Sequence, residues 1–160
     1  MAITSKKISP CLWFDNRIEE AVNFYISVFG GKLLSTSHYG EGAPQPKGTV
    51  MTMTFTLQDE QFVALNGGPH FKFNEAVSFM VKCETQAAVD KYWDALTADG
   101  GQESQCGWLK DKYGLSWQIA PAALLDRIND QDPEKAKRTM QAMMTMKRID
   151  IAAIEAAHAG

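Results

Sequence analysis

Hydrophobic and polar positions along the chain follow two periods, one typical of helices and one typical of strands. Apolar residues recur at helical spacing in a first stripe of Ile18, Ala21, Val22, Tyr25 and Phe29. A second helical stripe comprises Ala88, Val89, Tyr92 and Leu96. From Thr49 to Leu57 the period is two, since apolar residues at odd positions alternate with threonines, which predicts a strand with one buried face. The chain therefore mixes helices and half-buried strands, as α+β proteins do.

The same order of elements occurs twice. A shift of 67 residues, from 10 to 77, places 10–26 on 77–93 without a gap, and each copy runs on to a double glycine, Gly30-Gly31 or Gly100-Gly101. Glycine at that position suits a left-handed cap at the end of a helix. Three strands should follow each helix. In the first copy we expect these strands around His38, at 49–57 and at 62–66. In the second copy we expect them at 101–105, 106–109 and 115–119. Asp59-Glu60 predicts the hairpin turn between 49–57 and 62–66.

This repeat predicts two tandem βαβββ modules, whose curved mixed sheets enclose a cleft. Module one covers 6–68 and module two covers 69–121, within a domain at 1–121. The remaining segment, 122–160, is a helical tail that begins after Pro121 ends the last strand.

One tail helix has a clear start. Asp132-Pro133-Glu134 provides an N-cap, a proline at the first helical position and an acidic first turn. The helix that follows places apolar side chains on one side: Met140, Met143, Met144 and, further on, Ile151 and Ile154. Methionines at helical spacing are more typical of a packing surface than of a chemical site. That surface can pack on its own domain or on a second copy, and we expect a homodimer because dimers are the commonest oligomers.

Composition excludes several classes of protein. Of the 160 residues, 45% are apolar and 22% are charged, which is ordinary for one globular domain. The net charge of −3 argues against a nucleic-acid partner, and no apolar run approaches the ~20 residues that cross a bilayer. Met1 to Lys7 lacks the apolar segment of a signal peptide. The three cysteines, Cys11, Cys83 and Cys106, are odd in number and widely spaced, so we expect reduced thiols and a cytoplasmic location.

Five stretches carry a family resemblance. They are 8–15 (ISPCLWFD), 19–25 (EEAVNFY), 71–79 (FKFNEAVSF), 106–119 (CGWLKDKYGLSWQI) and the tail from Asp132 to Asp150. Together with the two βαβββ modules, these stretches resemble the vicinal oxygen chelate superfamily, which includes glyoxalase I, extradiol dioxygenases and antibiotic-binding resistance proteins. The match is with its PhnB-like branch, often labelled 3-demethylubiquinone-9 3-methyltransferase.

The methyltransferase label does not fit the pattern of glycines. An S-adenosylmethionine-dependent enzyme of the common doubly wound type needs a glycine-rich turn between its first strand and helix. Here no glycine pair forms GxGxG in such a turn, and the chain does not alternate single strands with helices. We therefore predict that the chain is not a methyltransferase of that type.

The resemblance also implies where a metal would bind. Metal-chelating members commonly use His and Glu on the first and last strands of each module, and the matching positions lie at or next to Ser9, Asn66, Ala76 and Gln118. None of these is a strong ligand for zinc, iron or nickel, so we predict no catalytic metal and no cofactor. His38, His70 and His158 form no HxH or HExxH spacing, although the loop that carries His70 could reach the mouth of the cleft.

Cysteine chemistry is a further possibility. Cys11 should face the cleft, and Cys106 begins a strand beside Trp108. A nucleophilic cysteine needs a base or a cation to lower its pKa, and no partner is near in sequence, so inert thiols are favoured. Asp111 lies in the turn before the last strand, and we assign it a turn role rather than an acid–base role.

The strand pleat predicts which residues line the cleft. They are Ser9, Cys11, Trp13, Asn66, Ser78, Met80, Trp108 and Gln118. Apolar walls with a few uncharged polar groups are typical of a small-molecule pocket, and the tryptophans could stack on a planar ligand. In the alternative interpretation, the cleft is filled by its own side chains and the tryptophans belong to the core.

Three functions follow, in order of preference. The first is a protein that binds a small organic molecule without a catalytic metal. The second is a metal-dependent lyase, isomerase or dioxygenase of the glyoxalase type, or an enzyme that uses Cys11. The third is a structural or regulatory dimer held together by the tail. No catalytic residue is assigned.

Overall fold

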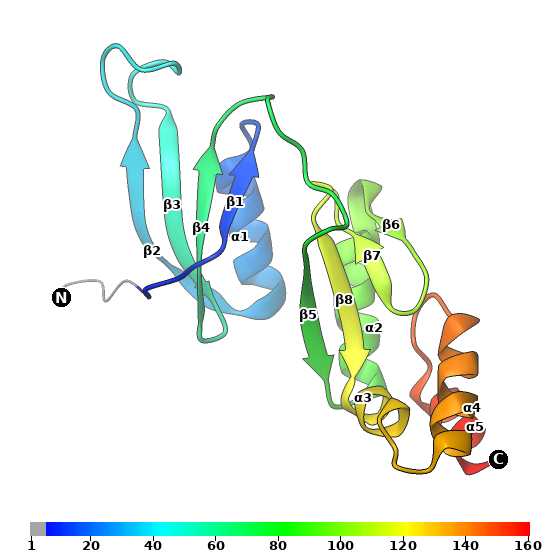
Figure 1. The fold of residues 1–160 in the computed structure, drawn as a ribbon. Helices are drawn as coiled ribbons and strands as arrows, with labels where there is room; N and C mark the ends of the chain where they lie inside the picture. The colour runs from blue at the N-terminus through cyan, green and yellow to red at the C-terminus, as the bar shows by residue number, and fades with distance from the viewer. Residues whose placement is uncertain (1–5) are drawn as a thin grey trace. The chain divides into compact units, whose positions relative to one another are not determined.

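The structure is a computed structural model that describes residues 6–160 (Figure 1). The chain folds as two compact units, and the boundary between them in the sequence falls between Lys72 and Phe73. The first unit contains β1 (Cys11–Phe14), α1 (Ile18–Phe29), β2 (Gly31–His38), β3 (Val50–Leu57) and β4 (Glu60–Asn66). The second contains β5 (Ser78–Cys83), α2 (Gln86–Thr97), β6 (Gln102–Glu103), β7 (Trp108–Lys110) and β8 (Ser116–Pro121), followed by α3 (Ala122–Ile128), α4 (Pro133–Met144) and α5 (Ile151–Ala159). The predicted α+β class and the two βαβββ modules are confirmed.

The first sheet has the strand order β1-β4-β3-β2. β1 runs parallel to β4, and the other neighbours are antiparallel. The predicted alternation is confirmed, because Met53, Phe55 and Leu57 are buried while the threonines between them are half-buried. The predicted stripe of α1 is also buried, so the helix covers one face of this sheet. Gly30 follows α1 with a φ of 76° and a ψ of 148°, so it has the positive φ that favours glycine but not the left-handed helical conformation that the double glycine predicts.

The second sheet repeats this topology with the order β5-β8-β7-β6. Its helix differs from the predicted stripe at two residues, because Ala88 and Tyr92 are only half-buried. Val89, Trp93 and Leu96 form the buried stripe of α2, and Tyr92 is half-buried. Tyr92 and Trp93 lie three and four residues after Val89, so either could lie on the buried side of the helix. Trp93 occupies the core because its Nε1 can donate to Glu103 Oε1 at 2.8 Å.

The tail forms three helices, and the expected stripe from Met140 to Ile154 is broken between Thr145 and Asp150. Asp132 caps α4 as predicted, accepting hydrogen bonds from the backbone of Glu134 and Lys135. Asp150 then caps α5 through the backbone N–H of Ala153, so a second helix begins here. The break lets Ile149 and Ile154 join Leu124 in a buried cluster, on which Met143 packs.

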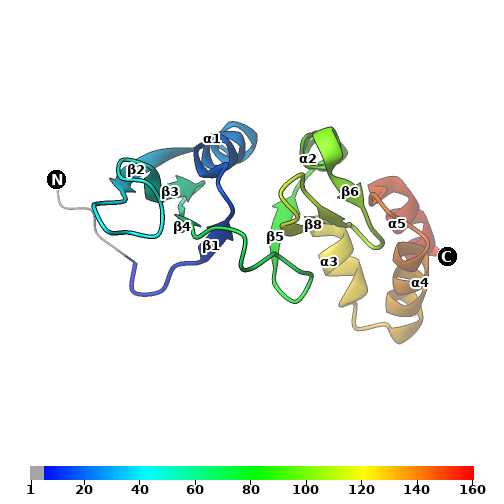
Figure 2. The same ribbon diagram turned by 90° about the horizontal axis from the view of Figure 1, so that it is seen from above.

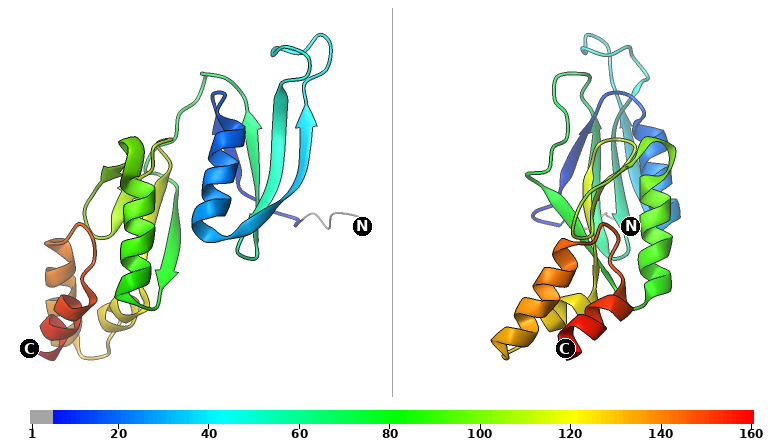
Figure 3. Two further views of the ribbon diagram at one scale, coloured as in Figure 1. Left: turned by 180° about the vertical axis from the view of Figure 1, so that it is seen from behind. Right: turned by 90° about the vertical axis from the view of Figure 1, so that its right-hand side faces the viewer.

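The tail is fixed to the second module by polar contacts as well as by this cluster. The backbone N–H groups of Cys106 and Gly107 donate to the carbonyls of Met146 and Lys147, at 2.7 and 2.8 Å. The guanidinium of Arg148 pairs with two aspartates of α2, Asp90 and Asp94. Figure 2 shows α2 and α3 on opposite sides of the second sheet, and Figure 3 shows α4 and α5 side by side next to it.

Candidate functional site

Each sheet has one face that packs on its own module's helix and one face turned away from that helix, which we call the distal face. In the first sheet, strand register places Cys11 and Trp13 on the distal face, opposite Val63 and Leu65 of β4. Leu12 and Phe14 point to α1 and are buried. Cys11 is exposed, Trp13 is half-buried, and both sides of the predicted pleat are therefore as expected.

Trp13 is packed under the loop that follows its own sheet. Its Nε1 donates to the carbonyl of Gly68 at 2.9 Å, and the edge of the Phe71 ring lies against it at a centroid distance of 4.9 Å. A Cβ atom on Gly67 would come within 2.3 Å of the Trp13 ring, so only glycine fits there. Most of the hydrogen-bonding and stacking capacity of Trp13 is thus used within the protein.

Asn66 does not lie on the distal face. It is paired with Phe14, so its side chain points to the helix side of the sheet, where it is 2% exposed. Its Oδ1 accepts from the backbone N–H of Asn16 at 3.0 Å, and its Nδ2 donates to the carbonyl of Val50 at 3.2 Å. The expected cleft role is corrected to a structural one, because the neighbouring Leu65 occupies the distal position.

Three predicted residues form a row across the distal face of the second sheet. Met80 of β5 lies opposite Gln118 of β8, and Gln118 lies opposite Trp108 of β7. Ser78 lies on the same face, and its Oγ accepts a hydrogen bond from Gln118 Nε2 at 2.9 Å. The carboxamide of Gln118 is thereby held in place between an apolar residue and an aromatic one.

This row lines a cavity of about 180 Å³. The sheet side of the cavity comprises Met80, Cys106, Trp108, Gln118, Ile119 and Ala120. The opposite wall is provided by the tail, with Leu124, Leu125 and Ile128 of α3 and Met143 of α4. The structure therefore brings together Met80, Trp108 and Gln118 in one pocket, and leaves Ser9, Cys11, Trp13, Asn66 and Ser78 outside its lining.

The residues that sequence reasoning missed are Cys106, Ile119 and Ala120 on the sheet side and all four tail residues of the wall. Leu124, Leu125 and Ile128 follow one another at i, i+1 and i+4, a short helical pattern directly after Pro121. That spacing signals a helix with one apolar side. It carries no information that this side lies over the distal face.

Two polar groups of the pocket have capacity to spare. Within the described part of the chain, Trp108 Nε1 donates no hydrogen bond, and Gln118 bonds through its Nε2 to Ser78 alone. Gln118 Oε1 is thus an acceptor, and Trp108 Nε1 a donor, for a bound molecule. No ionised side chain lines the cavity, whose remaining lining is aliphatic, thioether or thiol.

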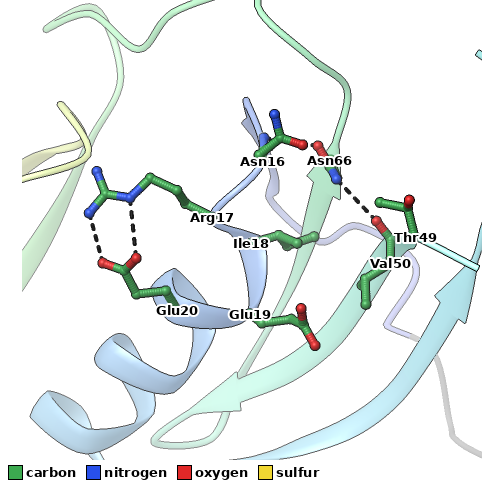
Figure 4. Close-up of a pocket in the computed structure, with 8 residues that line it drawn as sticks. All are labelled: Asn16, Arg17, Ile18, Glu19, Glu20, Thr49, Val50 and Asn66. Carbon is green, nitrogen blue, oxygen red and sulfur yellow. Dashed lines mark hydrogen bonds and ion pairs between the residues drawn. The ribbon is translucent and has the colours of Figure 1, made fainter. Parts of the chain in front are cut away.

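A second hollow, of about 370 Å³, lies at the beginning of α1 (Figure 4). Its lining includes Arg17, Glu19, Glu20 and Asn66. Arg17 is paired with Glu20 at 2.7 Å, and both ends of the Asn66 carboxamide are used as described above. The side chains of Arg17, Glu20 and Asn66 are thus bonded within the protein, and this arrangement explains how α1 begins.

Metal ligands are not gathered anywhere in residues 6–160, where no three His, Cys, Asp or Glu side chains lie close enough to hold an ion. At two of the family's metal positions, Ser9 accepts a long hydrogen bond of 3.4 Å from Gln61 Nε2, and Ala76 is exposed. His38 and His70 are exposed, and His158 is bonded through its Nε2 to Asp130 Oδ2 at 2.7 Å.

The cysteines lack the setting of a nucleophile. Partial burial of the thiol raises the pKa of Cys11, although the residue as a whole is exposed. Burial, followed by the charge of Glu84, raises the pKa of Cys83 to about 11. Both shifts oppose thiolate formation, the reverse of what nucleophilic catalysis requires.

Asp111 has the turn role that the sequence predicts. It is 2% exposed. Its Oδ1 accepts from the backbone of Tyr113 at 2.8 Å and of Leu115 at 3.1 Å, and its Oδ2 accepts from Trp117 Nε1 at 2.9 Å. The carboxylate thus fastens the turn to β8.

No helix within residues 6–160 has the length and apolar character needed to span a membrane.

Comparison with known proteins identifies the family. The sequence model of the family described as 3-demethylubiquinone-9 3-methyltransferase matches residues 6–120. A PhnB protein from Bacillus cereus is 37% identical, with a TM-score of 0.66, over 73% of this chain and 100% of that one. Protein PA1353 from Pseudomonas aeruginosa is 21% identical, with a TM-score of 0.60, over 73% and 98% of the two chains. Among curated proteins, none matches.

More distant structures share the fold alone. The fosfomycin resistance protein FosX from Listeria monocytogenes is 12% identical, with a TM-score of 0.54, over 79% of this chain and 97% of that one. The family match ends at residue 120, so the tail, which was expected to fit the same branch, lies outside it. The chain belongs to the family described as 3-demethylubiquinone-9 3-methyltransferase, the PhnB-like branch of the vicinal oxygen chelate superfamily.

Proposed function

We propose that this protein binds a small organic molecule on the distal face of its second sheet, without a catalytic metal. The observation that carries the proposal is the row of Met80, Gln118 and Trp108, which lines a cavity of about 180 Å³ beneath α3. An apolar cavity with a few fixed polar groups is what small-molecule recognition requires.

The absence of strong ligands at the family's metal positions supports binding without metal chemistry. Gln118 offers one neutral oxygen, and Asn66 is buried on the other side of its sheet. Neutral amide oxygens are weak ligands for transition metals compared with imidazole, thiolate or carboxylate. We therefore prefer a binding protein to a metal-dependent lyase, isomerase or dioxygenase.

Methyl transfer is also disfavoured, despite the family's description. The described strands form two four-stranded sheets that each contain one parallel pair, whereas the common methyltransferase fold uses a single, mostly parallel sheet with a glycine-rich turn. The distal-face pocket has no glycine-rich turn beside it that could hold a nucleotide-like cofactor.

We further propose a cytoplasmic homodimer. The three cysteines of the chain are free thiols, which supports a reducing compartment. Two methionines on α4, Met140 and Met144, are 41% and 63% exposed, which supports a surface for a second copy. Light scattering of the wild type and of a Met140→Glu/Met144→Glu variant tests the dimer, which we expect the double charge to dissociate.

The main experiment combines metal analysis with a ligand screen. Protein purified without chelator should hold far less than one equivalent of metal, and its thermal melt should not respond to Ni²⁺, Zn²⁺, Mn²⁺ or Fe²⁺. A screen of small organic molecules should yield ligands that raise the melt of the wild type and of Gln102→Ala, which changes an exposed residue of β6. Gln118→Ala should lose that response. A stoichiometric amount of metal would instead favour the alternative function, a metal-dependent enzyme.

A further inference from the structure

We infer that the tail helices restrict this pocket to an uncharged organic molecule built around a single ring, held by Gln118 and Trp108. The inference rests on the proposed function and specifies its ligand. It also assigns α3 and α4 a role in choosing that ligand, in addition to their role in stability.

The volume of the pocket sets the size of the ligand. A cavity of about 150 Å³ with apolar walls is enough to hold benzene. The pocket beneath α3 measures about 180 Å³, which leaves room for one ring and a short substituent. Two fused rings would require α3 or Met143 to move.

The lining excludes an ionised ligand. Its side chains are aliphatic, aromatic, thioether, thiol and amide, with no lysine, arginine, histidine or carboxylate among them. Two lysines lie on the same face in strand register, and neither lines the cavity: Lys110 pairs with Glu75, and Lys82, opposite Ala120, pairs with Glu84 at 4.0 Å. A charge placed beneath α3 would lose its hydration without gaining a counter-ion, which is strongly unfavourable.

The two polar groups define the orientation of the ligand. Gln118 is directly opposite Trp108 in the ladder, so its Oε1 and the Trp108 Nε1 are carried by neighbouring strands. A hydroxyl or a neutral amide on the ring can donate to the first or accept from the second. The indole itself provides an aromatic surface for the ring.

The opposite wall is contributed by residues beyond the family match, which ends at 120. Leu124, Leu125 and Ile128 lie on α3, and Met143 reaches the pocket from α4. The family's strand positions thus provide the polar groups, while the tail determines how much space remains above them. A change in the tail should therefore alter size selection and leave the preference for neutral ligands intact.

The test uses three single-ring probes of matched size: benzyl alcohol, benzoate and benzylamine at pH 7. Binding is followed by the indole N–H resonance of Trp108, which Trp108→Phe assigns. We expect benzyl alcohol to shift this resonance, and both ions to bind about ten-fold more weakly or worse because each would bury an unpaired charge.

Size selection is tested with 2-naphthol and a matched pair of variants. Met143 lines the pocket, whereas its neighbour Met144 is exposed and does not. Met143→Ala should improve the affinity for 2-naphthol by about ten-fold, since one or two methylenes can decide whether a ligand fits. Met144→Ala should leave it unchanged. Leu125→Ala, which opens the same wall from α3, serves if Met143→Ala does not fold.

The outcomes separate this inference from the proposed function. If benzoate or benzylamine binds beside Trp108 as tightly as benzyl alcohol, the site binds small molecules but the inferred ligand class is wrong. If the wild type binds 2-naphthol as well as the enlarged variants do, the tail does not set the size. If none of the probes shifts the Trp108 resonance, both the ligand class and the proposed function at this site are overturned.

Discussion

In the first module the distal face of the sheet carries Cys11, threonines and a tryptophan covered by its own loop, whereas in the second module the same face carries a pocket. Both sheets have the same strand order and the same parallel pairing of first and last strands. The Trp13 N–H donates to the carbonyl of Gly68, whereas the Trp108 N–H, which lines the pocket, donates no hydrogen bond within residues 6–160. What differs is the element opposite the face, which in the second module is α3. A duplicated fold can therefore form a pocket on one copy when a helix covers the distal face of that copy's sheet.

The largest expected effect concerns the buried polar side chain that fastens each module. Asp111→Ala removes an acceptor shared by two backbone amides and the Trp117 indole, and leaves these donors unsatisfied. We expect a loss of about 4 kcal/mol in the free energy of unfolding. Asn66→Ala removes two neutral hydrogen bonds in the first module and should cost about 2 kcal/mol. Urea unfolding measures both, and equal losses would contradict the asymmetry.

The next effect tests whether the tail is integral to the second module. Ile149 is fully buried with Leu124 and Ile154, so Ile149→Ala should cost about 3 kcal/mol of unfolding free energy by leaving a cavity. Met144→Ala, on the exposed side of α4, should cost almost nothing. A loss below about 1 kcal/mol for Ile149→Ala would mean that the cluster collapses easily or is only loosely formed.

The two tryptophans provide the most direct comparison of the distal faces. Trp108→Ala should weaken binding of a neutral single-ring ligand by about ten-fold or more, because it removes both a stacking surface and a free donor. Trp13→Ala should leave that affinity within about two-fold while lowering the melting temperature, since its ring is packed by Gly67 and Phe71. Titration calorimetry and thermal melts separate the two outcomes, and a reversed pattern would place the ligand on the first module.

The smallest effect at neutral pH concerns the thiols. The pKa of Cys83 is raised from 9.0 to about 11, so between these values the folded state holds a proton that the unfolded state has lost. The stability that this thiol contributes is complete below pH 9 and is lost as the pH rises through 11. Cys83→Ala should show a shallower decline of stability over that window than the wild type. In labelling experiments the exposed Cys11 should react first and the buried Cys83 only on unfolding.

Much of the fold could be predicted from short-range patterns. The alternation of Met53 and Phe55 with threonines determines the buried face of β3, and Asp132 with Pro133 determines where α4 begins. Leu12 and Phe14 are buried because they follow the same period of two. These predictions succeed because each depends on neighbours within one element.

The errors arose where two local solutions were equally good. Either Tyr92 or Trp93 can complete the stripe of α2, and the choice depends on a hydrogen bond to Glu103 in another strand. Asn66 and Leu65 differ by one position, and that single step moves a side chain from one face of the sheet to the other. The break between α4 and α5 contains no glycine or proline. The helix is interrupted because the Asp150 side chain caps a new helix, which is more favourable here than another turn of α4.

The candidate site was predictable in its strand half and not in its helical half. Met80, Trp108 and Gln118 share a face because of strand register, which the repeat reveals. Leu125 and Met143 reach the same pocket because α3 packs on β8 and α4 packs on α3. No period in a single sequence encodes which sheet face a later helix will cover.

The backbone contact between the turn before β7 and the tail makes two amides into reporters of the tail wall of the pocket. The N–H groups of Cys106 and Gly107 are bonded to carbonyls of the segment between α4 and α5, so they exchange with deuterium only when this segment lifts away. A molecule that touches both Trp108 and α3 favours the closed arrangement and slows exchange at these two positions. Occupancy of the pocket can therefore be followed at two peptide groups, without a label on the ligand and without an enzymatic assay.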